Sequence, residues 1–162
     1  MQATVERQTA FEVFYREERA GVLRALAYAL DDPDLAVECI DEAMARAYER
    51  WDSVAQMGNP TGWVFRVAMN VGHNRWRRLK LERRKPVRPD PQPADIEGVA
   101  DPAIARALAQ LPVDQRTVVV LRYHLDWSLE QIAEAVGSPI GTVKSRLHRT
   151  LARLETLLKE SA

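Results

Sequence analysis

The chain has 162 residues, 46% of them hydrophobic and 28% charged, a composition typical of one medium-sized or two small soluble domains. Its 23 basic and 23 acidic residues balance, so net charge predicts no class of partner. The single cysteine excludes an internal disulfide and fits a reducing compartment. Because no apolar run is long enough for a bilayer and the first residues lack a signal-peptide core, we expect a cytoplasmic protein without membrane insertion.

The first half of the chain predicts three amphipathic helices. Apolar residues repeat at threes and fours over about 8–30 and 35–51, and again from near Pro60 to about Lys85. Asp34 is expected to cap the second helix. The predicted apolar stripe of that helix consists of Val37, Ile40, Met44, Ala47, Tyr48 and Trp51, and its opposite face is acidic. The third helix is apolar in its first half and strongly basic in its second, so different faces should meet different partners.

The stretch PVRPDPQPAD, residues 86–95, is rich in proline and has almost nothing to bury. It predicts an extended, solvated linker. We therefore expect one domain over residues 1–85, a linker over 86–100 and a second domain over 101–162.

The second domain is also expected to be helical. Asp101 and Pro102 predict a helix start, Pro112 ends that helix, and Asp114 is expected to cap the next one. The run VVVL within this next helix could form a strand, but no second strand exists to pair with it. We predict a buried helix there, and an all-α fold.

Residues 128–158 have the pattern of a helix-turn-helix. Ser128 and Gln131 can form a capping box, Gly137 can end the first helix, and Pro139 prevents it from continuing. The predicted inner stripe of the second helix is Val143, Leu147, Leu151, Leu154 and Leu158, and its outer face is basic. This shape places side chains in the DNA major groove, although a plain helical hairpin with a solvated basic face has the same pattern.

Little in the sequence indicates catalysis. His73, His124 and His148 lie far apart and form no short-range metal pair. There is no glycine-rich phosphate loop and no nucleophile motif. We expect no enzyme activity, no metal and no cofactor.

Signals for nucleic-acid binding are stronger along the third helix. Trp63 and Trp76 alternate with arginines, a pattern that suits stacking on unpaired bases while cations hold phosphates. Asn70 and Asn74 lie one turn apart, and their amides can pair with base edges. Trp63 could equally belong to the core, and the asparagines could be solvated polar positions.

Taken together, these features resemble the extracytoplasmic-function (ECF) branch of the sigma-70 family. The resemblance rests on FYREERAGVLRALAYALDDPDLAVECIDEAMARAYERW, NPTGWVFRVAMNVGHNRWRR and ALAQLPVDQRTVVVLRYHLDWSLEQIAEAVGSPIGTVKSRLHRTLARL. The string GTVKSRLHR is a specific sign of the family. The resemblance implies two small helical domains, sigma-2 and sigma-4, joined by a flexible linker. It also implies a protein that binds core RNA polymerase, directs it to promoter DNA and is held inactive by an anti-sigma factor.

The resemblance further assigns roles to residues. Glu38, Asp41 and Glu42 would dock on the clamp helices of the polymerase β′ subunit, although Leu35 and Val37 stand where the family usually has further acids. Sigma-4 would also contact the β flap. Asn70 would bind a flipped −10 base in a pocket walled by residues 53–61, at a cost of a few kcal/mol for unstacking. The other −10 residues would be Trp63, Asn74, Arg75, Arg77 and Arg78. The −35 residues would be Thr142, Lys144, Ser145, Arg146, His148, Arg149 and Arg153.

Two alternatives remain beside this interpretation. A helix-turn-helix regulator that acts without core polymerase would account for the second half of the chain but not for the acidic helix or the Asn70 helix. A purely structural helical adaptor is the other. Asp126-Trp127 departs from the glycine-containing turn that usually precedes the helix-turn-helix, which should change local packing.

Overall fold

The computed structural model describes residues 1–82 and 101–161, and every regular element in this part is an α-helix. The elements are α1 (Gln2–Leu30), α2 (Pro33–Glu49), α3 (Trp51–Val54), α4 (Pro60–Glu82), α5 (Pro102–Ala109), α6 (Val113–Tyr123), α7 (Leu129–Val136) and α8 (Ile140–Glu160). The predicted all-α fold is confirmed. The predicted linker lies outside the described residues. No described helix has both the length and the apolar character that crossing a bilayer requires.

The break between α1 and α2 lies close to the expected place, but its cap differs. Asp31 ends α1 in the left-handed region, with φ of 51°. The Asp32 carboxylate then accepts a hydrogen bond from the Leu35 backbone N–H at 3.0 Å. Asp34, the predicted cap, lies in the first turn of α2 instead. The reason is Pro33, which occupies the first helical position and so leaves the capping position to the residue before it.

The start of α4 is fixed by the sequence Asn59-Pro60-Thr61-Gly62. The Asn59 side-chain oxygen accepts a hydrogen bond from the Gly62 backbone N–H at 2.9 Å, as an N-cap does. A Cβ atom at Gly62 would lie 2.4 Å from Asn59 Nδ2, so a side chain at this position would have to displace the Asn59 side chain that makes the cap. The start of the predicted promoter-recognition helix is therefore set locally.

Helix α6 contains the VVVL run, and Val118 to Leu121 are all buried, as predicted. Its N-cap position is Pro112 rather than Asp114, which lies within the first turn. An acid there still interacts favourably with the partial positive charge of the helix N-terminus.

The helix-turn-helix forms as the sequence predicts. Ser128 and Gln131 make a reciprocal capping box at the start of α7. Gly137 ends α7 with φ of 68°, a conformation in which other residues are strained. Pro139 then precedes the first residue of α8.

Two predicted apolar stripes are partly wrong. Val37 and Tyr48 of α2 are 39% and 41% exposed, although the Tyr48 ring packs edge-on against Phe11 of α1. Leu151 and Leu158 of α8 are 37% and 38% exposed. They line an apolar groove of about 570 Å³ between α5, α6 and α8. The buried face of α8 includes Thr150 and Leu157 in place of Leu151 and Leu158.

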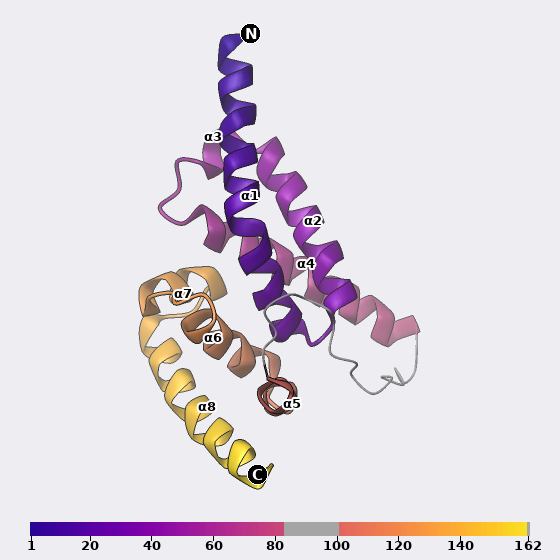
Figure 1. Ribbon diagram of the computed structural model, residues 1–162, viewed down its shortest axis with the longest axis vertical. Helices are drawn as coiled ribbons and strands as arrows, with labels where there is room; N and C mark the ends of the chain where they lie inside the picture. The colour runs from indigo at the N-terminus through magenta and orange to yellow at the C-terminus, as the bar shows by residue number, and fades with distance from the viewer. Residues whose placement is uncertain (83–100, 162) are drawn as a thin grey trace.

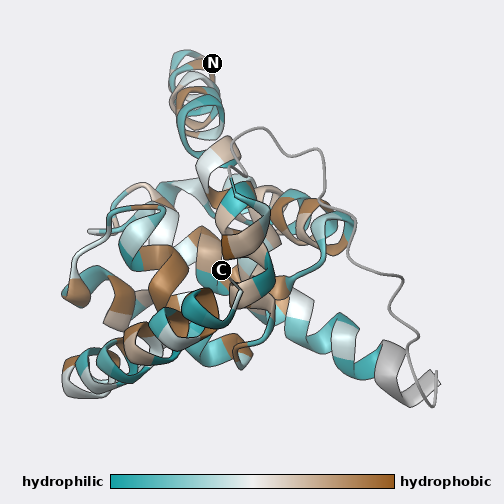
Figure 2. Ribbon diagram, turned by 60° about the horizontal axis from the view of Figure 1, so that its bottom comes forward, coloured by the Kyte–Doolittle hydropathy of each residue, from teal (hydrophilic) through white to brown (hydrophobic). Residues whose placement is uncertain are grey.

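The N-terminal helices α1–α4 and the C-terminal helices α5–α8 pack against each other and share one core (Figure 1). Hydrophobic residues gather where the helices face one another, whereas the C-terminal part of α4 projects from the body and is largely hydrophilic (Figure 2). Helix α6 lies against α1, and α7 lies against α4. The helix-turn-helix is thus held beside the predicted −10 helix.

Asp126 and Trp127 account for part of this packing. Asp126 adopts φ of 54° and so takes the left-handed position that glycine would otherwise supply. The turn directs Trp127 into the interior, where its ring lies edge-on to Phe65 of α4, with 6.0 Å between centroids. The departure from the usual turn therefore adds a contact between the two halves of the chain.

Candidate functional site

The outer face of α8 carries the residues predicted for the −35 element. Exposed side chains along it are Lys144, Ser145, His148, Arg149 and Arg153, and Thr142 is half-buried at its start. The opposite face of the helix carries Val143, Leu147 and Thr150, which are buried. Because the buried face anchors α8 in the core, the polar face is presented on a rigid scaffold.

Arg146 differs from its neighbours on α8. It is half-buried, and its Nε atom lies 3.6 Å from an Asp114 carboxylate oxygen on α6. The pair links the recognition helix to the helix behind it. Within the described residues, Arg146 therefore has an ion pair that the other predicted −35 residues lack.

The predicted −10 residues lie along α4. Asn70, Asn74, Arg77 and Arg78 are exposed. Trp76 is also exposed, at 48%. Val64, Ala68 and Val71 on the other side of the same helix are buried and fix its orientation. Aromatic, amide and guanidinium groups therefore alternate along the solvated side of one helix.

The sequence left open whether Trp63 belongs to the core or contacts nucleic acid, and the structure has features of both. Trp63 is half-buried and packs against the core, which suits a supporting role for this part of α4. Of the predicted pocket wall, Ser53 and Val54 belong to α3, and residues 55–59 form the turn that leads into α4.

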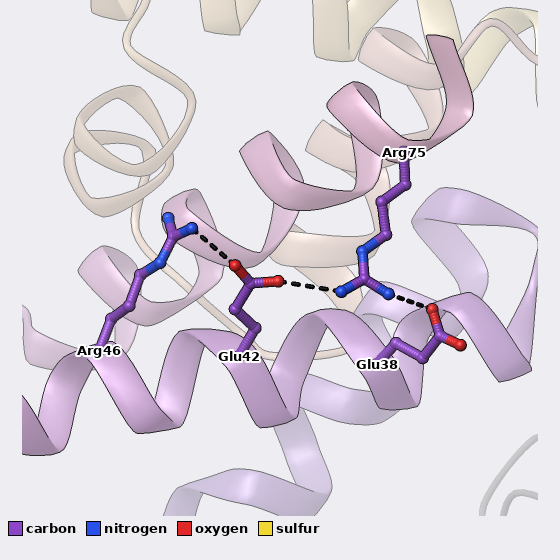
Figure 3. Close-up of polar contacts among 4 residues, drawn as sticks. All are labelled: Glu38, Glu42, Arg46 and Arg75. Carbon is purple, nitrogen blue, oxygen red and sulfur yellow. Dashed lines mark hydrogen bonds and ion pairs between the residues drawn. The ribbon is translucent and has the colours of Figure 1, made fainter. Parts of the chain in front are cut away.

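The acidic residues of α2 are held by arginines from two other helices. Asp41 accepts a hydrogen bond from Arg19 of α1 at 2.9 Å. Glu38 and Glu42 point toward Arg75 of α4, which donates one N–H to each carboxylate (Figure 3).

The pKa values of Arg19 and Arg75 are both raised by these contacts. The hydrogen bond that Arg19 donates to Asp41 is the largest influence on Arg19 and raises the pKa of that guanidinium. Desolvation is the largest single influence on Arg75 and lowers its pKa, but Glu38 and Glu42 together outweigh it, and the net shift of the pKa is upward. Both arginines stay charged at any physiological pH.

Sequence reasoning missed the most deeply buried charged residue of the described chain. Arg116 of α6 is 3% exposed. Its guanidinium donates to the Ala29 carbonyl at the end of α1, at 2.6 and 2.9 Å, and to the Leu111 carbonyl at 3.1 Å. It thereby satisfies a carbonyl in the last turn of α1 and one in the turn between α5 and α6. No local pattern marks Arg116, because its shortest hydrogen bonds go to Ala29, 87 residues away in the sequence.

The sequence can be compared with known protein families. Residues 14–82 match the family described as Sigma-70 region 2, and residues 102–154 match Sigma-70, region 4. The RNA polymerase sigma-E factor of Streptomyces coelicolor is 37% identical over 147 residues, which cover 89% of this chain and 83% of that protein. The chain belongs to the sigma-70 family.

Within the family it is an ECF sigma factor. The ECF RNA polymerase sigma factor SigL of Mycobacterium tuberculosis is 32% identical over 153 residues, covering 89% of this chain and 86% of SigL. As in other members, the function of the chain is to direct promoter-specific initiation of transcription, so a regulator that acts without polymerase is not favoured.

Two solved structures share the fold of this sigma factor over both of its halves. The sigma factor RpoE of Bartonella quintana, in complex with the anti-sigma factor NepR, has a TM-score of 0.76 and 24% identity and covers 93% of this chain and 97% of its own. CnrH, in complex with the cytosolic domain of CnrY, has a TM-score of 0.69 and 21% identity and covers 99% and 95%.

Proposed function

We propose that this sigma factor divides promoter recognition between its two helical domains, over residues 1–85 and 101–162. Helix α8 recognises the −35 element and α4 recognises and helps to open the −10 element. The observation that carries the proposal is that both helices expose a polar, basic face while their opposite faces are anchored in one core.

On α8, Lys144 and Arg149 are the expected donors to guanine, because both are exposed and each good base contact is worth about 1–3 kcal/mol. Thr142, Ser145 and His148 would complete the contact with base edges. Arg153 would hold phosphate and contribute affinity without sequence information. Arg146 would meet phosphate only if its pair with Asp114 is broken or shared.

Helix α2 is the proposed docking surface for core polymerase. Glu38, Asp41 and Glu42 lie on its outer side, and each is at least partly exposed. Carboxylates in this setting suit a basic surface on the polymerase, such as that of the β′ clamp helices. Contact of the C-terminal domain with the β flap is part of the same proposal. The polymerase supplies the chemistry of initiation, so the chain needs no catalytic group.

We further propose that an anti-sigma factor controls this protein in the cytoplasm. The support is that structural relatives over both halves of the chain were each solved with such a partner or with a partner domain. Affinity purification from unstressed cells should recover a second protein besides polymerase. Recovery of polymerase alone would contradict this part of the proposal.

The central test combines polymerase binding with promoter binding. The chain should co-elute with core polymerase in gel filtration, and the holoenzyme should protect a −35 element from cleavage. Lys144→Glu and Arg149→Glu should abolish that protection and keep co-elution.

Lys159→Glu is the matched control, since Lys159 lies on the same helix and is paired with Glu155 at 2.8 Å. If the Lys159 variant also loses protection, the total charge of α8, rather than particular residues near its N-terminus, determines affinity for the −35 element. A chain that does not co-elute with polymerase would overturn the docking role of α2.

A further inference from the structure

Arg75 lies between the two surfaces to which we assign different partners. It projects from α4 toward α2, where its two terminal nitrogens donate to Glu38 and to Glu42, the latter at 3.1 Å (Figure 3). The other carboxylate oxygen of Glu42 accepts from Arg46 at 2.6 Å. One cation of the promoter-binding helix is thus held by two anions of the polymerase-docking helix.

The ion pairs compete with the proposed partners, because Arg75 is expected to bind DNA and the two glutamates are expected to bind polymerase. A guanidinium that donates to two carboxylates presents fewer N–H groups and less net charge to a DNA phosphate. The same carboxylates, while they hold Arg75, attract a basic group of the polymerase less strongly. In the free protein, the acids of α2 therefore lower the affinity of Arg75 for DNA, and Arg75 lowers the affinity of these acids for polymerase.

We propose that Arg75 is exchanged between these surfaces when the holoenzyme assembles. Basic groups of core polymerase take over Glu38 and Glu42, and the released Arg75 pairs with a promoter phosphate beside Asn74. Docking on polymerase thereby increases the affinity of α4 for DNA. The inference rests on the proposed roles of α2 and α4 and adds the means by which the first controls the second.

The exposure of the three side chains makes the exchange feasible. Arg75, Glu38 and Glu42 are 40%, 58% and 35% exposed. Ion pairs of this kind are weak because water and salt screen them. Two such pairs set an expected coupling of roughly 2- to 30-fold in affinity. A coupling of that size tunes binding without locking the protein in one state.

Other arginines of the described chain do not have this arrangement. Arg19 also binds an acid of α2, Asp41, but it projects from α1. Arg46 binds Glu42 within α2 itself. Within the described residues, Arg75 is the cation of α4 that forms ion pairs with acids of α2.

The first experiment is a double-mutant cycle on the free protein. Binding to a labelled single-stranded oligothymidine is measured against salt for the wild type, Glu38→Gln/Glu42→Gln, Arg75→Gln and the triple variant. Loss of the two carboxylates should raise affinity roughly 2- to 30-fold and steepen the salt dependence by about one released counterion. In the Arg75→Gln background, both gains should fall to the small effect of a general change in charge.

The matched control is Asp34→Asn/Glu49→Gln, which removes two exposed carboxylates of α2 other than the two that pair with Arg75. It should give a smaller gain that is the same with and without Arg75. If Glu38→Gln/Glu42→Gln shows an equal gain in both backgrounds, the effect is general charge and the exchange is overturned.

The second experiment measures the reciprocal effect on core polymerase. Arg75→Gln should raise affinity for core roughly 2- to 30-fold, because Glu38 and Glu42 no longer hold a cation of their own chain. Unchanged or weaker binding would mean that Arg75 only braces α4 against α2, and would overturn the proposal.

The docking role itself is tested separately by Glu38→Gln/Glu42→Gln, which should weaken binding to core. If these substitutions leave core binding intact, the proposed role of α2 fails, whatever the cycle on DNA shows. Because all three residues are partly exposed, equal helicity and equal thermal midpoints across the set are expected.

Discussion

At the scale of single residues, Asn70 is an exposed member of the proposed −10 residues. It lies on the solvated side of α4, one residue after buried Met69 and one before buried Val71. Its side chain is therefore held in place by the helix and contributes nothing to the core. Removal of its amide should affect DNA and little else.

We expect Asn70→Ala to weaken binding of the holoenzyme to an opened −10 strand by roughly 5- to 150-fold, the value of one good base contact. Affinity for core polymerase should not change. Fluorescence anisotropy with a forked promoter probe and gel filtration with core measure the two effects. Gln110→Ala, an exposed amide at the end of α5, is the control. Equal loss of both affinities would show that Asn70 is structural.

The residue scale also shows what the sequence could and could not predict. The exposed faces of α4 and α8 follow from periodicity, and so Asn70, Lys144 and Arg149 are placed where the sequence puts them. The partner of Arg75 does not follow, because Glu38 and Glu42 lie on another helix. Arg75 resembles Arg77 and Arg78 in sequence, yet it is directed toward α2.

At the scale of elements, the turn of the helix-turn-helix depends on Gly137. Its φ of 68° is unfavourable for a side chain, and a Cβ there would lie 3.3 Å from the guanidinium of Arg66. Gly141, four residues later, has ordinary helical geometry and open space around the position of a Cβ. The two glycines should therefore respond in opposite ways to the same substitution.

We expect Gly137→Ala to lower the free energy of unfolding by about 1–2 kcal/mol. Gly141→Ala should raise it by about 0.5–1 kcal/mol, because alanine favours the helix and restricts the unfolded chain. Urea denaturation followed by circular dichroism measures both. Destabilisation of similar size in both variants would contradict the assignment of a special backbone requirement to Gly137.

The helix boundaries were the most predictable elements, since caps and breakers act over a few residues. The capping box of α7 and its Gly137 end are confirmed. Failures arose where two local signals competed, as at Asp32 and Asp34, or where burial depends on distant helices. Leu151 and Leu158 illustrate the second kind, because only the position of α5 and α6 leaves them beside an open groove.

At the scale of the whole molecule, the two halves are packed together, and this conflicts with the spacing of promoter elements. Elements centred near −35 and −10 are about 25 base pairs apart, or roughly 85 Å along the helix. A compact chain of this length has a radius of gyration of about 15 Å. On the roles proposed for α8 and α4, the halves must therefore separate on a promoter, and the contacts between them are a cost of binding.

Arg116 is the polar contact that opposes this separation most directly. We expect Arg116→Met, which keeps the length of the side chain, to destabilise the packed form by about 1–3 kcal/mol, since the Ala29 carbonyl of α1 loses its donor from the other half. Small-angle X-ray scattering should show a larger radius of gyration. The control is Arg106→Met, which replaces an exposed arginine of α5 and should leave the radius of gyration unchanged. An unchanged radius in Arg116→Met would instead show that apolar contacts alone hold the two halves together.

His124 makes the same packing sensitive to pH. Its ring lies edge-on to Tyr28 of α1, with 5.5 Å between centroids, at the contact between the two halves. Burial, and then the nearby charge of Arg24, lower the pKa of His124 below its ordinary value of 6.5. The packed form therefore binds fewer protons than the unfolded chain between the lowered pKa and 6.5, and stability rises with pH across that window.

The free energy of unfolding should accordingly fall as the pH drops below about 6.5, by at most about 1.4 kcal/mol per pH unit for one proton. His124→Gln should remove this part of the slope, because glutamine does not titrate. His73→Gln, on the exposed side of α4, should keep it. Urea titrations at several pH values between about 5 and 8 measure the slope, and an unchanged slope in His124→Gln would place its origin in other groups. Since the two halves must part for promoter binding, mild acid should favour the separated form in the wild type and have less effect in the His124 variant.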